Sequence, residues 1–383
     1  MPSFCSLETC KEEIEFLCLE RLNFILFLPP ISNTKVSLKR SSAHMSVRKA
    51  VRAGTWYDGD ASRLGRYIEK SLSQAEELIA QETGNSDSAR NADGKQVLGI
   101  IGPHAGLSYC GATSACAYSR LKDFLYRDTA NGRVEGDAVE RIFLIGPSHA
   151  KYFRGVQFPE TSAIETPFGN LRVDTSFQKS VESACKSTGC PTGWMTKKED
   201  EAEHSLELHT PFLSNILMTP PAGKRALSDI QIVPIVVGDM DAELESAFGA
   251  ALRSFLPKSP SESAANLFCI SSDFCHWGSR FRYTHRYDPS TPTIGDSIEK
   301  MDRDAMKIIE ANDCKAWQSY LRKTENTICG RHAIASFMYA TQPEQVGGAP
   351  AAKAEFVHYS QSSRVTAPDD SSVSYAAAVL TRQ

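Results

Sequence analysis

The stretch Val97-Leu-Gly-Ile-Ile-Gly-Pro-His104 decides the fold, because an apolar run stops at a Gly-Pro turn and delivers a histidine. Runs of this length, rich in Val, Ile and Leu, are typical of strands that are covered on both faces. The same pattern returns as Ile142-Phe-Leu-Ile-Gly-Pro-Ser-His149. Two further apolar runs, 232–237 and 267–270, end as abruptly, in glycine or serine. The sequence therefore predicts four buried strands.

Helical patterns fill the gaps between these runs. Apolar residues recur at intervals of three and four over 62–80, and similar patterns cover 111–124 and 242–255. Strands that alternate with helices predict an α/β fold whose central, largely parallel or mixed sheet is flanked by helices. In such sheets ligands bind at the carboxyl ends of the strands, so we expect the functional site at that edge.

The charge balance and the cysteine pattern exclude several classes of protein. The 383 residues include 42 Lys and Arg against 46 Asp and Glu, a net charge of -4, which provides no basic field for nucleic acid. The 11 cysteines form no C-x-x-C pair, so a reducing compartment is the simpler interpretation. The apolar block 24–28 is far shorter than the roughly 20 residues of a membrane span, and we expect no stable membrane insertion.

Residues 1–45 differ in composition from the rest of the chain. An acidic stretch leads into the apolar block and then into a segment rich in Ser, Lys and Arg. We expect a disordered or weakly helical N-terminal extension that the fold does not need. The alternative is an amphipathic anchor that touches a membrane. The globular pattern that follows predicts one α/β domain over 46–383.

Three of the four strand ends present side chains that can bind a metal ion. His104 and His149 follow the two Gly-Pro turns, and Asp273 and Cys275 follow the run at 267–270. The carboxyl ends of neighbouring strands converge, so we expect one shared site. With Asp273 the ligands would be two histidines and a carboxylate, whereas Cys275 makes a softer site that favours copper, zinc or ferrous iron. The alternative for each residue alone is an ordinary loop histidine or a buried apolar cysteine.

The segment Glu203-His-Ser-Leu-Glu-Leu-His209 holds two further candidates. His204 and His209 can donate or accept a proton at the cleft, or bind a ligand by hydrogen bonds. The alternative is a solvated helix N-terminus, whose acidic residues suit the helix dipole. The spacing differs from H-E-x-x-H, which disfavours a metalloprotease. Downstream, Cys329-Gly-Arg-His332 opens a helical pattern that would place backbone N–H groups near the cleft.

Taken together, segments spread from about residue 51 to the C-terminus resemble the Memo family, the mediators of cell motility. Each segment alone is short, but their order and combination are highly specific. The segments are Arg52-Ala-Gly-Thr-Trp-Tyr57, Gly102-Pro-His-Ala-Gly106, Ile145-Gly-Pro-Ser-His149, Glu203-His-Ser-Leu-Glu-Leu-His209, Ser271-Ser-Asp-Phe-Cys-His-Trp-Gly278, Thr327-Ile-Cys-Gly-Arg-His332 and Asp370-Ser-Ser-Val-Ser-Tyr-Ala376. Residues 1–44 lie outside the resemblance.

The resemblance implies a fold similar to that of the class III extradiol dioxygenases, which are non-haem iron enzymes. It implies His104, His149 and Cys275 as the metal ligands, with Cys275 in the place of the carboxylate. It also implies one iron or copper ion, while the candidate ligands by themselves also admit zinc. Proteins of the family act in cell motility, redox signalling and metal handling in the cytoplasm and nucleus. The expected partner is therefore a signalling protein or peptide.

Three functions remain open at this point. The first is a metal-binding signalling protein without efficient dioxygenase activity. A thiolate ligand donates more electron density than a carboxylate and is itself open to oxidation, which disfavours ring cleavage. The second is a non-haem metal-dependent oxidoreductase, or a hydrolase, with His204 or His209 as the acid/base group. The third is a binding module whose cleft receives a peptide or protein.

Overall fold

The computed structural model describes residues 46–84, 95–259, 262–342 and 352–382. The predicted N-terminal extension over 1–45 lies outside the described residues, so its expected disorder and its expected dispensability stay predictions. From residue 46 onward, the described chain alternates strands and helices in the way that the sequence predicts.

A large sheet forms the centre of the fold, with strands in the order β10-β12-β2-β9-β3-β8-β4-β7 and with β11 paired to β12. Its strands are β2 (Gln96–Gly102), β3 (Arg141–Pro147), β4 (Val156–Pro159), β7 (Thr192–Met195), β8 (Gln231–Val237), β9 (Asn266–Ser271), β10 (His276–Trp277), β11 (Lys353–Gln361) and β12 (Ser372–Arg382). A small second sheet joins β1 (Val47–Arg48), β5 (Ala163–Ile164) and β6 (Leu171–Arg172).

The central strands of the large sheet are parallel, and its flanks are antiparallel. β2, β9, β3 and β8 run in the same direction. β12 pairs antiparallel with β2, and β4 pairs antiparallel with β8. The four predicted apolar runs lie inside the four parallel strands, so the expectation of an α/β fold with a mixed sheet is confirmed.

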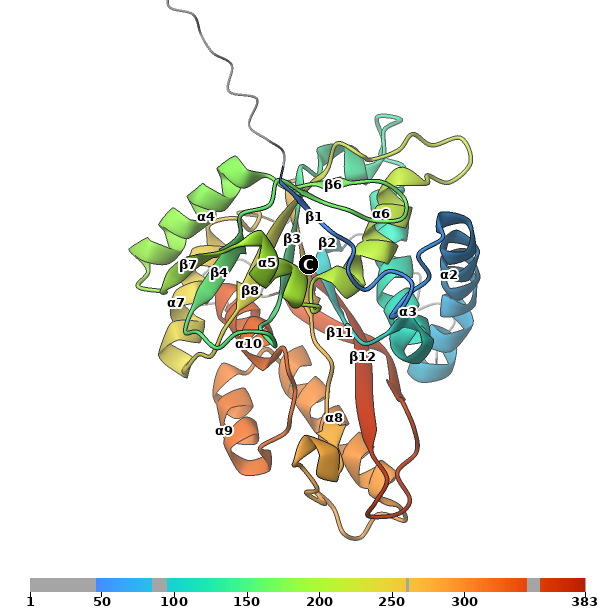
Figure 1. The fold of residues 1–383 in the computed structure, drawn as a ribbon, viewed down its shortest axis with the longest axis vertical. Helices are drawn as coiled ribbons and strands as arrows, with labels where there is room; N and C mark the ends of the chain where they lie inside the picture. The colour runs from blue at the N-terminus through green and yellow to red at the C-terminus, as the bar shows by residue number, and fades with distance from the viewer. Residues whose placement is uncertain (1–45, 85–94, 260–261, 343–351, 383) are drawn as a thin grey trace, which may run out of the picture. The chain divides into compact units, whose positions relative to one another are not determined.

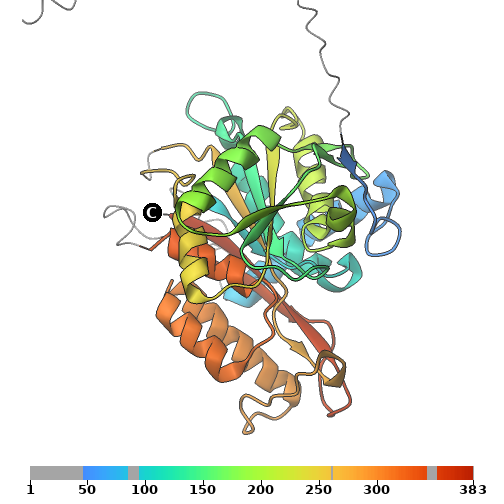
Figure 2. The ribbon, with the colours of Figure 1, turned by 60° about the vertical axis from the view of Figure 1, so that its left-hand side comes forward.

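Helices cover both faces of this sheet (Figures 1 and 2). The helices α2 (Ala61–Thr83), α3 (Leu107–Leu125) and α6 (Thr210–Met218) supply residues to one apolar cluster. The helices α4 (Thr175–Ser187), α7 (Ala242–Arg253), α8 (Ile294–Glu310), α9 (Cys314–Thr324) and α10 (Arg331–Ala340) supply residues to the other. Shorter elements are α5 (Lys197–Ala202), η1 (Glu135–Ala138), η2 (Glu207–His209) and η3 (Ser279–Phe281). None of the helices within the described ranges is long and apolar enough to cross a membrane.

The strand β2 shows how the sheet fills both apolar clusters. The side chain of Val97 belongs to the cluster under α2 and α3, whereas that of Leu98 belongs to the cluster on the opposite face. At Gly99 the strand runs so close to β9 that a Cβ atom would lie 1.8 Å from the carbonyl oxygen of Phe268. Only glycine allows this approach, which holds β2 and β9 side by side up to the edge where both strands end.

Candidate metal centre

The candidate site lies where β2, β3 and β9 end. His104 follows β2, His149 follows β3, and Cys329 lies just before helix α10. One potential ligand atom of each residue lies within 4.8 Å of the others. The Sγ atom of Cys329 is 3.3 Å from Nε2 of His104. Metal–ligand bonds are about 2.0–2.3 Å long, so two atoms that bind the same ion lie about 3–4.6 Å apart. The distances between the three side chains therefore fit a single ion.

Hydrogen bonds fix the tautomer of His104. Its Nδ1 lies 2.6 Å from Oγ of Ser271, and that hydroxyl donates its hydrogen to the carbonyl oxygen of Ser205 at 2.8 Å. A hydroxyl has one hydrogen, so Nδ1 of His104 must be the donor in this pair. The lone pair of a neutral ring then lies on Nε2, the atom beside Cys329, as a metal ligand requires. Burial, helped by the neighbouring imidazole of His149, lowers the pKa of His104 and keeps the ring neutral.

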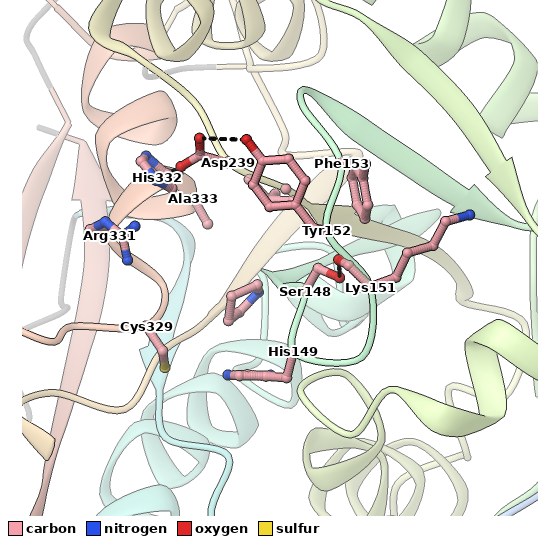
Figure 3. Close-up of a pocket in the computed structure, with 13 residues that line it drawn as sticks. Ser148, His149, Lys151, Tyr152, Phe153, Asp239, Cys329, Arg331, His332 and Ala333 are labelled. Atoms are coloured by element: carbon pink, nitrogen blue, oxygen red, sulfur yellow. Dashed lines mark hydrogen bonds and ion pairs between the residues drawn. The ribbon is translucent and has the colours of Figure 1, made fainter. Parts of the chain in front are cut away.

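His149 is oriented by the carboxylate of Glu203. Nδ1 of the ring is 3.0 Å from Oε1 of Glu203, and the backbone N–H of His149 donates to Oε2 at 2.5 Å. A carboxylate that holds one imidazole nitrogen leaves the other nitrogen free for a metal ion. Figure 3 shows the ring of His149 pointing toward the sulfur of Cys329.

Glu203 is a buried anion that the surrounding chain satisfies. Only 1% of the residue is exposed. Its carboxylate accepts hydrogen bonds from the backbone N–H groups of Ala150, His204 and Ser205, in addition to those from His149. Burial alone would raise the pKa of Glu203, but His149 and these N–H groups outweigh it and hold the pKa well below its usual range. Glu203 therefore stays ionised and keeps His149 in place.

Cys329 reaches the two imidazoles because Gly330 packs directly on the end of β9. A Cβ atom at Gly330 would lie 2.4 Å from Cβ of Ser272, and the N–H of Gly330 donates to Oγ of Ser272 at 3.0 Å. The backbone N–H of Asp273 donates to Sγ of Cys329 at 3.2 Å. A hydrogen bond donated to the sulfur favours its thiolate form, which is the form that binds metals.

The electrostatics of the metal-free site favour a protonated His149. Burial would lower the pKa of His149, but the Cys329 sulfur in its thiolate form and the Glu203 carboxylate outweigh it and raise the pKa to about 10. Burial raises the pKa of Cys329, and His149 opposes that effect. A bound cation would displace the protons that this pair holds, so metal binding at neutral pH should release protons.

Cys275 lies outside this group of ligand atoms. Its side chain is fully buried in the large apolar cluster that contains Phe274 and Trp277. The segment after β9 pairs with β12, since the N–H of Phe274 donates to the carbonyl of Ser374 at 2.8 Å and the N–H of Ser374 donates to the carbonyl of Cys275 at 2.9 Å. Burial raises the pKa of the Cys275 thiol well above its ordinary value. The structure thus brings Cys329, rather than Cys275, to the two histidines.

Asp273, the alternative third ligand, is already bonded to the chain. Its Oδ1 accepts the backbone N–H of His104 at 2.8 Å, and its carbonyl oxygen accepts the backbone N–H of Cys329 at 3.3 Å. Burial raises the pKa of Asp273. The residue therefore ties together the two segments that carry His104 and Cys329.

His204 lies beside the candidate ligands. Its ring stacks on that of His149 with the ring centroids 4.4 Å apart, and Trp56 lies on another side at 4.9 Å. With His149 and Glu203 it forms a second group of potential ligand atoms within 4.8 Å of one another. Burial, with the charge of His149, lowers the pKa of His204 to about 4, so the ring is neutral at pH 7 and able to accept a proton.

His209 lies in the core instead of the cleft. It is 0% exposed, and its Nδ1 lies 2.7 Å from the hydroxyl of Tyr118 on α3. Burial lowers its pKa to about 3. Among the described residues, the two cavities beside the candidate ligands are lined by other side chains. The geometry therefore offers His204, and not His209, to a bound molecule.

A cavity of about 410 Å³ adjoins His149 and Cys329 (Figure 3). One wall is the segment 147–153 after β3, and the facing wall is the segment 329–333 at the start of α10. Asp239, which follows β8, also lines the cavity and lies between these walls at one end (Figure 3). This volume is in the range of pockets that hold small molecules.

A second cavity, of about 590 Å³, is lined by His204 and Asp273. It is also lined by Trp56 and Tyr109, which are 37% and 66% exposed. Exposed aromatic side chains of this kind are common where proteins contact other molecules. The candidate ligands thus lie beside two cavities that differ in their lining.

Sequence reasoning missed the orienting roles of Glu203 and Arg48. Arg48 is 2% exposed, and its guanidinium donates to Asp200 at 3.0 Å, to Glu207 at 2.8 Å and to the carbonyl oxygen of Glu203 at 2.7 Å. These bonds anchor the segment that carries Glu203 and His204. The pattern around Glu203 contained a signal, because a buried acid next to histidines suggests an oriented imidazole. Nothing local marked Arg48, whose carboxylate partners lie more than 150 positions away.

Comparisons with known proteins cover nearly all of the described chain. The family model described as Memo-like protein matches residues 48–379. The Protein memo-1 homolog of Caenorhabditis elegans is 34% identical over 359 residues, which are 94% of this chain and 88% of the relative. Protein MEMO1 of Homo sapiens is 35% identical over 334 residues, which are 87% of this chain and 97% of the relative. Protein MEMO1 of Danio rerio is 36% identical over 339 residues, covering 88% and 99% of the two chains.

Proposed function

The chain belongs to the Memo family, and on that premise we propose that it binds one iron or copper ion through His104, His149 and Cys329. The proposal is carried by the convergence of their ligand atoms within 4.8 Å of one another. His104 and His149 each have Nδ1 engaged in a hydrogen bond, which leaves Nε2 for a metal. Two imidazoles and one soft sulfur suit copper or ferrous iron and admit zinc.

We place this metal-binding protein in redox signalling, metal handling or cell motility, in the cytoplasm and nucleus. When bound, the metal would supply redox and Lewis-acid chemistry. The part of the chain around it would fix the imidazoles through Ser271 and Glu203 and keep His204 neutral beside them. The cavity with Trp56 and Tyr109 is where a signalling peptide would bind, because it offers aromatic surface next to the site.

Elemental analysis of the purified protein, loaded with metal and then dialysed, tests the site. We expect about one equivalent of iron or copper in the wild type and a large loss in His104→Ala, because two remaining ligands hold a divalent ion poorly. His285→Ala is the matched control, since His285 is an exposed histidine away from the cluster. An unchanged metal content in His104→Ala would contradict the proposal.

The cavity of about 410 Å³ beside His149 and Cys329 favours a second candidate function, a metal-dependent oxidoreductase that acts on a small molecule. His204, neutral and next to His149, would then accept or donate the proton. We still expect no efficient ring cleavage, because a thiolate in place of a carboxylate is itself oxidised by the oxygen that the reaction needs. Oxygen uptake by iron-loaded protein with catechol, compared with metal-free protein, decides between the two. Robust turnover would favour the enzyme.

A further inference from the structure

The cavity of about 410 Å³ beside His149 and Cys329 contains an arginine that has no ion-pair partner among the described residues. Arg331 stands on the same wall as Cys329 and faces the segment that carries His149 (Figure 3). Within the described ranges its guanidinium forms no ion pair, and the hydrogen bond it makes, to the carbonyl oxygen of Ile328, is long at 3.5 Å. A guanidinium carries five N–H donors and keeps its charge at every physiological pH.

The other charged groups of this cavity already have partners. Lys151 is paired with Glu199 at 2.6 Å. His332 is held at 2.6 Å by Glu245, whose side chain is buried. Asp239 lies 3.6 Å from Nε2 of His332 and accepts a hydrogen bond from the hydroxyl of Tyr152 at 3.3 Å. Arg331 is therefore the charged group of this cavity that is left to pair with a bound anion.

The positions of Arg331 and of the candidate metal-binding residues define which molecule fits the cavity. The wall of the cavity of about 410 Å³ carries the candidate metal ligands His149 and Cys329 at one place and Arg331 at another. Planar carboxylates match the fork of a guanidinium by forming two parallel hydrogen bonds. A ligand with a metal-binding group and a separate carboxylate would satisfy both places at once.

We propose that this cavity binds a small carboxylate ligand, with Arg331 as the counter-ion of the carboxylate and with the remainder of the molecule directed at the metal site. The proposal rests on the proposed function, because the second contact needs the metal ion. It specifies the chemical class of ligand, which the family match leaves open. Arg331 acts in it as a specificity-determining residue and not as a metal ligand.

A comparison of two probes tests the proposal in the full-length protein, loaded with ferrous iron and kept under nitrogen. The probes are catechol and 3,4-dihydroxybenzoate, which share the metal-binding group and differ by one carboxylate. We expect the wild type to bind 3,4-dihydroxybenzoate about tenfold more tightly than catechol in calorimetric titrations. Arg331→Gln should abolish this preference, and Arg331→Lys should retain part of it. Arg322→Gln, which removes an exposed arginine of α9, should leave the preference intact.

Iron content, measured in the same samples, separates this proposal from the proposed function. Bound iron with equal affinity for the two probes, or a preference that survives in Arg331→Gln, would overturn the carboxylate proposal and leave the metal site standing. If no iron is bound, the proposed function fails. In that case the carboxylate proposal survives only if the metal-free wild type still prefers 3,4-dihydroxybenzoate through Arg331, and it fails otherwise. Thermal unfolding of each variant confirms that it is folded.

Discussion

The Sγ atom of Cys329 lies 3.3 Å from Nε2 of His104, although 225 positions separate the two residues in the chain. The contact joins the end of β2 to the turn that precedes α10. Asp273 holds the two segments together, since it accepts backbone N–H groups from both residues. This relationship makes Cys329 the sulfur ligand of the proposed metal site.

Glu203→Gln should weaken metal binding while the protein stays folded. The amide keeps the shape of the carboxylate but gives up its charge, so it holds Nδ1 of His149 less firmly. Loss of such an orienting partner typically lowers metal affinity about 10- to 100-fold. Competition titration with a metal chelator measures the effect, and Glu243→Gln on the exposed first turn of α7 is the control. Equal affinities in Glu203→Gln and the wild type would show that Glu203 does not orient His149.

The metal-free protein should lose stability as the pH rises from about 7 to about 10. The pKa of His149 in the folded protein, about 10, lies above the value of about 6.5 for an unfolded histidine. The protonated ring therefore adds stability that is complete below about pH 6.5 and disappears as the pH rises through the folded-state value. Thermal midpoints across this range measure the loss, and His149→Ala should flatten the profile. A wild-type thermal midpoint that does not fall over this pH range would contradict the raised pKa of His149.

Metal binding should release protons at pH 7.5. In the metal-free site Glu203 and Cys329 raise the pKa of His149 and burial raises that of Cys329, so the pair holds protons that must leave when both residues become ligands. Apparent metal affinity should therefore increase from pH 6 to pH 9. Calorimetric titrations in two buffers of different ionisation enthalpy count the released protons. Binding without proton release, or weaker binding at pH 9, would count against this pair of ligands.

Arg48→Met should destabilise the fold by about 3–5 kcal/mol, the usual cost of leaving buried charges without their partner. The Arg48 side chain is 3% exposed and pairs with Asp200 and Glu207, whose side chains are 4% and 0% exposed. Urea unfolding measures the loss. Arg63→Met is the matched control, because its ion pair with Asp58 lies at the surface and its loss should change little. Similar unfolding midpoints for the two variants would rule out the role assigned to Arg48.

Much of the fold could be predicted because its signals are local. The apolar runs that form β2, β3, β8 and β9 are continuous, and each is followed directly by glycine or serine. His104 and His149 could be placed at one sheet edge for the same reason, since each directly follows a parallel strand. The parallel arrangement of the strands alone therefore predicts that the two imidazoles lie close together.

The third ligand could not be predicted in the same way. Cys275 follows a parallel strand as His104 does, but the chain after β9 pairs with β12 and the thiol of Cys275 lies in the core. Cys329 belongs to a turn before a helix, and its approach to His104 depends on the packing of Gly330 against Ser272. Such packing is a property of the tertiary structure, and no local pattern encodes it.

His209 shows a second limit of sequence patterns. Its segment is rich in polar residues, which suggested a cleft or a solvated helix end, yet the ring is buried against Tyr118. The local sequence does not distinguish a buried histidine that is hydrogen-bonded to a hydroxyl from an exposed histidine. Its neighbour His204, five positions earlier, lies beside the site because Glu203 fixes the backbone there.

The central claim is that Cys329, and not Cys275, supplies the sulfur ligand. Metal content per folded chain in Cys329→Ala and Cys275→Ala, measured by elemental analysis after identical loading, tests it most directly. Each variant removes one sulfur from the chain, and thermal unfolding reports any effect on the core. We predict that Cys329→Ala loses most of its metal and that Cys275→Ala retains the wild-type amount. Full metal in Cys329→Ala together with loss in Cys275→Ala would contradict the account.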